Sequence, residues 1–456
     1  MDATTTSLVE LLSGLKGAVV APDDAHYEEA RRVFYGKIDR RPAVIARPAN
    51  AAEVGRVVSL ARETGLELAV RSGGHSLAGH GVSEGGIVLD LSGLKALDID
   101  VQSRTAWAET GLTAAEYTTA VGAHGLATGF GDTGSVGIGG LTLGGGVGFL
   151  VRKYGLTIDD LLAAEVVTAE GELLSVDAES RPDLFWAIRG GGGNFGVATR
   201  FHFRLRDVDT IVGGMLILPA TPDVIASFVA EADAAPDELS AIANIMVAPP
   251  MPFLPPEAHG KLVVLALMCY AGDADAGERA MEPFRRLAEP VADMVRPMRY
   301  PEIYRLFAEE EGPGPDQEVA RSLFVDAVDR DAAEGILDHL RASTAPMAVA
   351  QLRVLGGAMA RVRPDATAFA HRARRVMVAL GAVYERAEET AEHESWVSDL
   401  AASLGGEGVY VNFLGDEGEA RVREAYPGAT WDRLAAVKAR YDPTNLFRLN
   451  QNVPPA

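Results

Sequence analysis

Three glycine-rich stretches, residues 72–81, 129–148 and 190–196, punctuate the first half of this chain. Glycine has no Cβ atom, so each stretch lets the backbone approach a bound molecule or a neighbouring strand closely. Three such loops in one region favour a site for something large, flat and anionic, whose charge is met by backbone N–H groups. Close packing of strands is the simpler alternative.

The third loop contains GGGNFG (191–196), which matches the G-x-G-x-x-G pattern of dinucleotide-binding folds. That pattern requires a helix immediately afterwards, because the helix N-terminus holds the phosphates. The residues that follow, VATRFHFRLR (197–206), alternate as a strand does. The sequence therefore predicts a glycine turn that leads into a strand, and it excludes the helical phosphate site.

Strand and helix patterns alternate around these loops. Residues 42–74 are predicted to form a strand, a helix and a second strand, with Asn50 and Glu53 spaced as a capping box. One face of that helix is apolar, made of Val54, Val57, Val58 and Ala61. Further strands are expected within 85–100, 104–111 and 161–176, and a further helix within 113–127.

The pattern changes near Val212, where longer helices and separate strands begin. Because 456 residues exceed the limit of about 250–300 for a single core, two domains are expected. The proline-rich segment 248–260 is interpreted as a loop, since proline cannot sit in a central strand. The predicted elements are a helix at 221–235, strands at 261–272 and 347–360, a strand at 410–413 and a helix at 431–441.

Composition excludes several classes of partner. The formal net charge of −22 argues against nucleic acid and anionic membrane surfaces, which attract clustered Lys and Arg. No stretch has the roughly 20 unbroken apolar residues of a membrane span. The single cysteine, Cys269, allows no internal disulfide, and the N-terminus lacks the basic and apolar regions of a secretory signal. A cytoplasmic location is expected.

Ser76 in GHSLA raises the possibility of a serine hydrolase. The stretch approaches the G-x-S-x-G nucleophile elbow, but Ala78 replaces the final glycine and no helical pattern follows. His75 and His80 lie five residues apart without a nearby cluster of cysteine or carboxylate, so no metal site is expected. The hydrolase stays a remote alternative.

Five motifs stand in a fixed order: RSGGHS (71–76), GSVGIGGLTLGGGVG (134–148), LFWAIRGGGGNFGVAT (184–199), YVNF (410–413) and YDPTNLFRLNQNVPP (441–455). Together they resemble the berberine bridge enzyme-like FAD-linked oxidases, within the vanillyl-alcohol oxidase, or PCMH-type FAD-binding, superfamily. The resemblance implies an α+β fold of two domains, in which an antiparallel sheet covered by helices binds the substrate. The implied parts are an FAD-binding domain at 1–208, a substrate-binding domain at 209–405 and a C-terminal segment, 406–456, that returns to the first.

The resemblance implies that the flavin is covalently bound to His75, at the 8α methyl carbon of the isoalloxazine. Many relatives add a second tether from a cysteine, but Thr133 stands at that position here and Cys269 lies in the other domain. A single tether is therefore expected. The implied FAD-binding residues are Arg71, Ser72, Gly73, Gly74 and Ser76 at the pyrophosphate, Asp132, Thr133, Ser135, Gly139, Gly140, Gly144 and Gly145 along the flavin and ADP, Val197 near the adenine, and also Tyr410, Asn412 and Asn450.

Two positions depart from the family. Val147 replaces a tyrosine that acts as base in many relatives, and Leu141 replaces a histidine that often lies near the flavin. Tyr410 is the remaining acid or base, with Asn412 expected on the same strand face. A tyrosine with a pKa of about 10 would need a shift of about three units to act as a base at pH 7.

Arg353 and Gln351 share one face of a predicted strand. Arg353 is a candidate substrate anchor or a cation that lowers the pKa of Tyr410, and a salt bridge at the rim is the alternative. Gln351 is expected to line the same pocket. Val136 stands where the family places a gate toward oxygen, and its small side chain favours an oxidase.

The implied reaction is oxidation of a small molecule at a C–H bond next to oxygen or nitrogen. Hydride passes to the His75-bound flavin, and dioxygen reoxidises the flavin with release of hydrogen peroxide. A flavin-dependent dehydrogenase or a redox-neutral enzyme of secondary metabolism is the alternative, motivated by Val147. Sugars, amines and aromatic or polyketide alcohols all remain open as substrates, and so does the oligomeric state.

Overall fold

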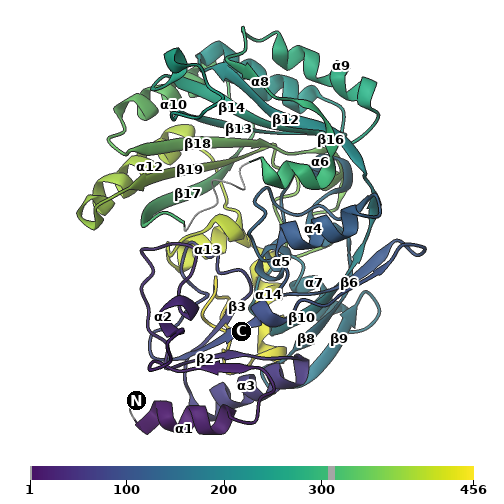
Figure 1. Cartoon of the computed structure of the whole chain (residues 1–456), viewed down its shortest axis with the longest axis vertical. Coiled ribbons are helices and arrows are strands. Elements are labelled where there is room, and N and C mark those ends of the chain that lie inside the picture. The colour runs from purple at the N-terminus through teal and green to yellow at the C-terminus, as the bar shows by residue number, and fades with distance from the viewer. Residues whose placement is uncertain (1–2, 307–313) are drawn as a thin grey trace.

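The computed structural model describes residues 3–306 and 314–456, and it consists of two bodies stacked along the long axis (Figure 1). The lower body in this view contains two main sheets and a two-stranded one, in which β11 (Arg206–Asp207) pairs with β7 (Leu126–Ala127). One main sheet has the order β1-β2-β4-β3, in which β2, β4 and β3 run parallel. Its strands are β1 (Ala18–Val20), β2 (Val44–Arg47), β3 (Leu68–Arg71) and β4 (Ile87–Asp90), and its neighbouring helices are α1 (Ala3–Leu12), α2 (Tyr27–Ala30) and α3 (Ala51–Thr64).

The second sheet of the lower body is antiparallel, with the order β5-β6-β10-β8-β9. Its central strand β10 (Val197–Arg204) follows the third glycine loop directly, as the sequence predicts. The other strands are β5 (Leu97–Asp100), β6 (Thr105–Glu109), β8 (Leu161–Val167) and β9 (Leu173–Asp177). The helices of this region are α4 (Ala114–Gly122), α5 (Ile138–Gly144), α6 (Val151–Tyr154) and α7 (Pro182–Ala187).

The upper body is one antiparallel sheet of eight strands covered by helices on its outer face (Figure 1). The strands are β12 (Thr210–Pro219), β13 (Leu239–Val247), β14 (Leu262–Tyr270), β15 (Ala292–Asp293), β16 (Arg296–Arg299), β17 (Gln317–Val325), β18 (Met347–Val354) and β19 (Val376–Tyr384). The covering helices are α8 (Pro222–Ala234), α9 (Ala274–Arg285), α10 (Arg330–Ala342) and α12 (Thr390–Leu404). The predicted α+β fold of two domains is confirmed. No helix in the described part of the chain is long and apolar enough to cross a membrane.

Helix α3 shows how local sequence signals set the elements. Asn50 Oδ1 accepts a hydrogen bond from the Glu53 N–H at 3.1 Å, so the predicted N-cap is present. The Glu53 carboxylate accepts instead from the backbone N–H groups of Lys16, Gly17 and Ala49. The Glu53 side chain therefore does not complete the capping box. It binds the N-terminal segment to α3 instead.

The prediction of a strand at 410–413 is wrong. Residues Val411–Phe413 form a 3₁₀ turn, closed by a hydrogen bond from the Phe413 N–H to the Tyr410 carbonyl oxygen at 2.8 Å. Gly144 makes this arrangement possible, because a Cβ there would lie 2.0 Å from Asn412 Oδ1. The turn therefore lies against the second glycine loop, and no strand beside it supplies ladder hydrogen bonds.

The C-terminal segment packs into the lower body, where α14 (Ala429–Tyr441) contacts α7 (Figure 1). Lys438 is fully buried and anchors the segment. Its ammonium group donates to the carboxylate of Asp442 at 2.7 Å, to the Asn194 carbonyl oxygen at 2.7 Å and to the Phe447 carbonyl oxygen at 2.8 Å. One side chain thus joins the C-terminal segment to the third glycine loop.

Lys438→Met is expected to lower the free energy of unfolding by about 3–5 kcal/mol, because it leaves the Asp442 carboxylate buried without its cation. Chemical denaturation of the purified variant measures the change. Arg440→Met is the matched control, since Arg440 forms an exposed pair with Asp183 and its loss should cost at most about 1 kcal/mol. Equal losses in the two variants would contradict the anchoring role.

Candidate functional site

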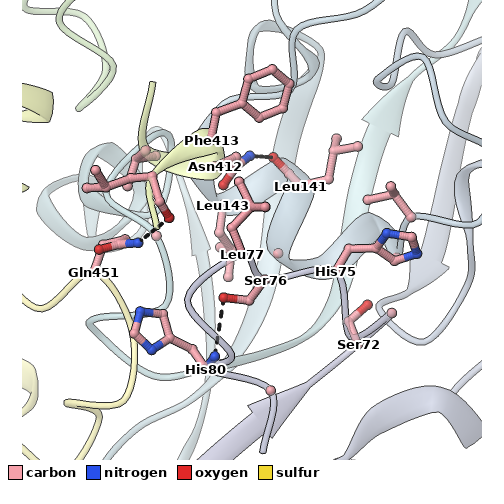
Figure 2. Close-up of a pocket in the computed structure, with 18 of the residues that line it drawn as sticks. Ser72, His75, Ser76, Leu77, His80, Leu141, Leu143, Asn412, Phe413 and Gln451 are labelled. Carbon is pink, nitrogen blue, oxygen red and sulfur yellow. Dashed lines mark hydrogen bonds between the residues drawn. The ribbon is translucent and has the colours of Figure 1, made fainter. Parts of the chain in front are cut away.

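A cavity of about 580 Å³ lies between the two bodies. The glycine loops of the lower body form one wall, and strands β17, β18 and β19 of the upper body form the opposite wall, which we call the roof. The 3₁₀ turn and residues near Gln451 close a further side (Figure 2). A cavity of this size, lined from two bodies, is typical of a site for an organic cofactor or substrate.

The first and second glycine loops interlock on the cavity wall. A Cβ at Gly73 would lie 2.3 Å from the Gly137 nitrogen, so only glycine permits this approach. The Ser72 hydroxyl donates to the Thr110 carbonyl oxygen at 2.6 Å and accepts from the Gly139 N–H at 3.3 Å. Gly140 has open space where a side chain would stand. The loops thus present a rigid backbone surface to the cavity.

Arg71 stabilises the start of the first glycine loop through contacts with neighbouring segments. Its guanidinium donates to Asp90 Oδ2 at 2.8 Å and to the Ala30 carbonyl oxygen at 2.6 Å, and it is buried. The side chain is therefore not free to hold a pyrophosphate, as the family resemblance implied. Arg71 instead fixes the start of the loop that carries His75.

His75 is half-buried on the cavity wall, and its ring stacks on Phe34 with 4.2 Å between ring centroids and 23° between planes. Burial lowers the pKa of His75 to about 4, although a hydrogen bond with the Ser135 backbone acts in the opposite direction. The imidazole is therefore neutral near pH 7, with the nucleophilic nitrogen that bond formation to carbon requires.

The structure contradicts the hydrolase alternative at Ser76. Its hydroxyl accepts a hydrogen bond from the His80 backbone N–H at 3.2 Å, and the rings of His75 and His80 point in different directions (Figure 2). Neither ring reaches the Ser76 hydroxyl, and a turn follows the serine in place of the helix of a nucleophile elbow. Within residues 3–306 and 314–456, no cluster of His, Cys, Asp or Glu could hold a metal ion.

Tyr410 and Asn412 meet as predicted, although a turn and not a strand brings them together. The Tyr410 hydroxyl oxygen accepts from the Gly146 N–H at 2.9 Å and from Asn412 Nδ2 at 2.9 Å. Asn412 Nδ2 also donates to the Leu141 carbonyl oxygen at 3.0 Å (Figure 2). Because both lone pairs of the hydroxyl are engaged, its proton is left to donate to a molecule in the cavity.

The lowered pKa that a base at position 410 would require is not what the surroundings of Tyr410 favour. Burial raises the pKa of Tyr410 to about 12, which outweighs the lowering by the Gly146 and Asn412 hydrogen bonds and by the Arg353 charge. Tyr410 is therefore a neutral hydrogen-bond donor near pH 7. The sequence could not reveal this, because it does not show that the phenol is fully enclosed.

Arg353 lies in the cavity as predicted, but it is paired. It is 4% exposed, and its guanidinium donates to Asp132 Oδ2 at 2.7 Å and to Gln351 Oε1 at 2.8 Å. Gln351 Nε2 donates in turn to Asn244 Oδ1 at 2.7 Å. This polar chain joins the roof to the second glycine loop and neutralises Asp132. Arg353 does form a salt bridge, as the alternative proposed, but the pair is buried and does not lie at the rim.

The remaining predicted residues divide into two groups. Gly144 and Gly145 lie behind the wall, against Asn412 and Phe369, and Ser135 reaches the site through its backbone contact with His75. The side chain of Ser135 is buried without a hydrogen-bond partner among the described residues. The predicted residues that line the cavity directly include Thr133, Val136, Gly139, Gly140, Val197, Asn412 and Asn450, and the departures Leu141 and Val147 lie beside them.

Sequence reasoning missed residues that reach the cavity from other segments. They are Phe34, Tyr35, Glu318, Phe413 and Gln451. Phe34, Tyr35 and Glu318 belong to no glycine loop or motif, whereas Phe413 and Gln451 stand in the YVNF and YDPTNLFRLNQNVPP motifs without being singled out. Only the alternation of β17 (Gln317–Val325) could have indicated a position such as Glu318, because alternate residues of that strand face the cavity.

Comparison with known proteins decides the family. The model of the FAD binding domain matches residues 42–177, and the model described as berberine and berberine like matches residues 409–454. (R)-6-hydroxynicotine oxidase from Paenarthrobacter nicotinovorans is 32% identical over 97% of each chain. This chain belongs to the berberine bridge enzyme-like family. As a berberine bridge enzyme-like protein it is an FAD-linked oxidoreductase.

Other relatives agree on the fold and differ in the substrates that their names give. Xylooligosaccharide oxidase from Thermothelomyces thermophilus is 28% identical, over 100% of this chain and 95% of its own. The crystal structure of 6-hydroxy-D-nicotine oxidase from Arthrobacter nicotinovorans superposes with a TM-score of 0.88 at 28% identity, covering 97% of this chain and 99% of that one. The berberine bridge enzyme-like fold is thus confirmed, whereas the substrate is not fixed by it.

The cavity of this berberine bridge enzyme-like protein fits FAD. The interlocked glycine loops offer backbone N–H groups and open surface to a flat ring system, and a neutral imidazole stands on the same wall. The residues that would hold FAD are those of the three glycine loops, with Asn412 and Asn450 from the C-terminal segment.

Proposed function

We propose that this protein is an FAD-dependent oxidase with its flavin attached to His75, acting on a small molecule with dioxygen as electron acceptor. The observation that carries the proposal is the neutral imidazole of His75, which Phe34 and Ser135 hold on the wall of an FAD-sized cavity. The names of the relatives, (R)-6-hydroxynicotine oxidase and xylooligosaccharide oxidase, support oxidase chemistry.

Bound FAD would supply the acceptor for two electrons from the substrate and the route by which they reach dioxygen, giving hydrogen peroxide. The residues of this chain bind and orient. The Arg353–Asp132 pair keeps the region beside Tyr410 electrically neutral and holds the roof against the second glycine loop. Small Val136 on the cavity wall leaves room for oxygen to enter.

Tyr410 would donate its proton in a hydrogen bond to the substrate oxygen or nitrogen beside the reacting C–H bond. Its hydroxyl is fixed by Gly146 and Asn412, so the direction of the O–H bond is set before the substrate arrives. Such positioning reduces the entropy that must be lost in the transition state. The fully enclosed phenol also excludes water from this corner of the cavity.

Reoxidation in air tests the oxidase proposal. The purified yellow protein is reduced by light under nitrogen and mixed with air-saturated buffer while the flavin absorbance is recorded. An oxidase with a turnover of about 1 s⁻¹ or faster should regain its absorbance within about a second and release an equivalent of peroxide. Recovery over minutes, without peroxide, would indicate the dehydrogenase alternative.

A further inference from the structure

The roof of the cavity carries a small apolar patch, which Ser322, Gln351 and Arg353 border. The register of the strands places Ala320 of β17 opposite Gly381 of β19, and Gly381 opposite Val349 of β18. Ala379 lies two residues before Gly381 in β19, on the same face of the sheet. These small side chains line the cavity and offer no hydrogen-bonding group, so they suit the apolar body of a substrate better than a ring of hydroxyl groups.

Glu318 stands at one end of this apolar patch. A Cβ built on Gly381 would lie 3.9 Å from Glu318 Oε1, so the carboxylate lies beside Gly381. Lys37 lies outside the cavity lining, is exposed, and donates to the main-chain oxygen of Glu318, not to its carboxylate. The carboxylate therefore has no hydrogen bond from a side chain or backbone N–H of the residues that the structure describes.

The other charged side chains of the cavity lining are paired. Arg71 bonds Asp90, Arg353 bonds Asp132, and Arg321 bonds the Ser398 hydroxyl at 3.2 Å and lies 3.8 Å from Glu417. Glu318 is thus the one charged group among the described lining residues whose ionised end is left for a ligand. Burial raises the pKa of Glu318 to about 7, although the charge of Lys37 acts to lower it. The present surroundings therefore do not stabilise the ionised carboxylate.

Aromatic rings flank the same end of the cavity. Tyr35 lines it and is close enough to Glu318 for the negative charge to help raise the pKa of the phenol, in addition to the larger effect of burial. Phe34 packs edge to face on Tyr35 with 5.0 Å between centroids. A carboxylate beside aromatic rings is the combination that recognises ammonium groups.

We propose that Glu318 anchors the ammonium group of a cationic substrate, whose apolar body lies under Ala320, Ala379 and Gly381. The substrates of this enzyme are therefore amines carrying an apolar ring or chain. This inference rests on the proposed function, because the same cavity holds the flavin. It separates this chain from oxidases of carboxylate substrates, which Glu318 would repel.

Binding of three probes of similar shape tests the anchor. Benzyltrimethylammonium carries a permanent charge, neopentylbenzene is its neutral isostere, and phenylacetate is an anion. Isothermal titration calorimetry on the protein as purified gives the three dissociation constants. We expect the cation to bind at least about tenfold more tightly than either of the others, because it alone is attracted by the Glu318 charge and by the aromatic rings.

Glu318→Gln removes the charge and keeps the shape. It should weaken binding of the cation about 10- to 100-fold and leave that of the neutral isostere unchanged. Glu394→Gln is the matched control, because Glu394 on α12 is exposed, also acts on Lys37 and lies outside the cavity lining. It should change neither affinity by more than about twofold.

Gly381→Val supplies a second, independent test. Its Cβ would make only ordinary contacts, so the strand should keep its fold, while the added methyl groups fill the space beside the carboxylate. Binding of the cation should weaken severalfold although Glu318 is intact. Unchanged affinity of the cation for Glu318→Gln, or tighter binding of the isostere or the anion by the wild type, would overturn the proposal. Failure of the proposed function would appear separately, as a protein purified without flavin colour.

Discussion

His75→Ala should abolish the covalent attachment of flavin completely. In the wild type, acid precipitation and filtration should leave the yellow colour with the protein, because the proposed bond between flavin and imidazole would survive denaturation. In the variant all of the flavin should pass into the filtrate. The glycine loops remain, so the variant should still bind FAD reversibly, and the mass of its denatured chain should equal that of the polypeptide alone.

His80→Ala is the matched control for the tether. His80 lies five residues further along the same loop, lines the same cavity and has no hydrogen-bond partner for its ring among the described residues. Its loss should leave the flavin covalently bound. Flavin retained by His75→Ala in acid, or wild-type protein that loses its flavin there, would refute the tether.

A second effect should accompany the loss of the tether. An alkylated imidazole withdraws electrons from the ring to which it is bonded, so the reduction potential of the flavin should fall in His75→Ala. Equilibration with redox dyes measures that fall directly. It also distinguishes a chemical role of His75 from one of binding alone, which would leave the potential of the bound flavin unchanged.

Tyr410→Phe should lower kcat/KM by about 10²–10⁴-fold, the usual range for loss of a positioned proton donor or acceptor. The variant removes the hydroxyl proton that Gly146 and Asn412 leave free to donate into the cavity, and it leaves the Gly146 N–H without an acceptor. Initial rates of peroxide release, with a substrate found in a screen of amines, sugars and aromatic alcohols, measure the effect. The covalent flavin content should stay at the wild-type level.

Tyr426→Phe controls for the loss of a buried hydroxyl. Tyr426 lies in the same C-terminal segment, is 1% exposed and donates to the Gly190 carbonyl oxygen at 3.2 Å, but it does not line the cavity. Its removal should cost about 1 kcal/mol of stability and leave kcat/KM within about twofold. A Tyr410→Phe enzyme as active as this control would exclude Tyr410 from the reaction.

Local signals in the sequence predicted much of the lower body. The cap at Asn50, the apolar face of α3 and the alternation after GGGNFG each depend on residues within a few positions, and each is present in the structure. The turn at 410–413 was mistaken for a strand, because YVNF has the composition of a strand while its conformation is set by contact with Gly144, far away in the sequence.

The site was predictable where a sequence motif indicates function, and less so where segments that are distant in the sequence meet. His75, Tyr410 and Arg353 were found from the glycine turn, the YVNF motif and strand alternation. Phe34 and Glu318 were not, since the first follows a short helix and the second begins an ordinary strand. Phe34 meets His75 through the folding of the lower body, and Glu318 reaches the cavity only where the upper body covers it, so no spacing in the chain records either contact.

The cavity wall runs from Phe34 to Gln451, almost from one end of the polypeptide to the other. Because these segments lie far apart in the sequence, the pocket is complete only after the long-range contacts of the fold have formed. Gln451 closes it partly through its bond to the Leu414 carbonyl oxygen. Cofactor loading is therefore expected to follow folding of the polypeptide and not to guide its first steps.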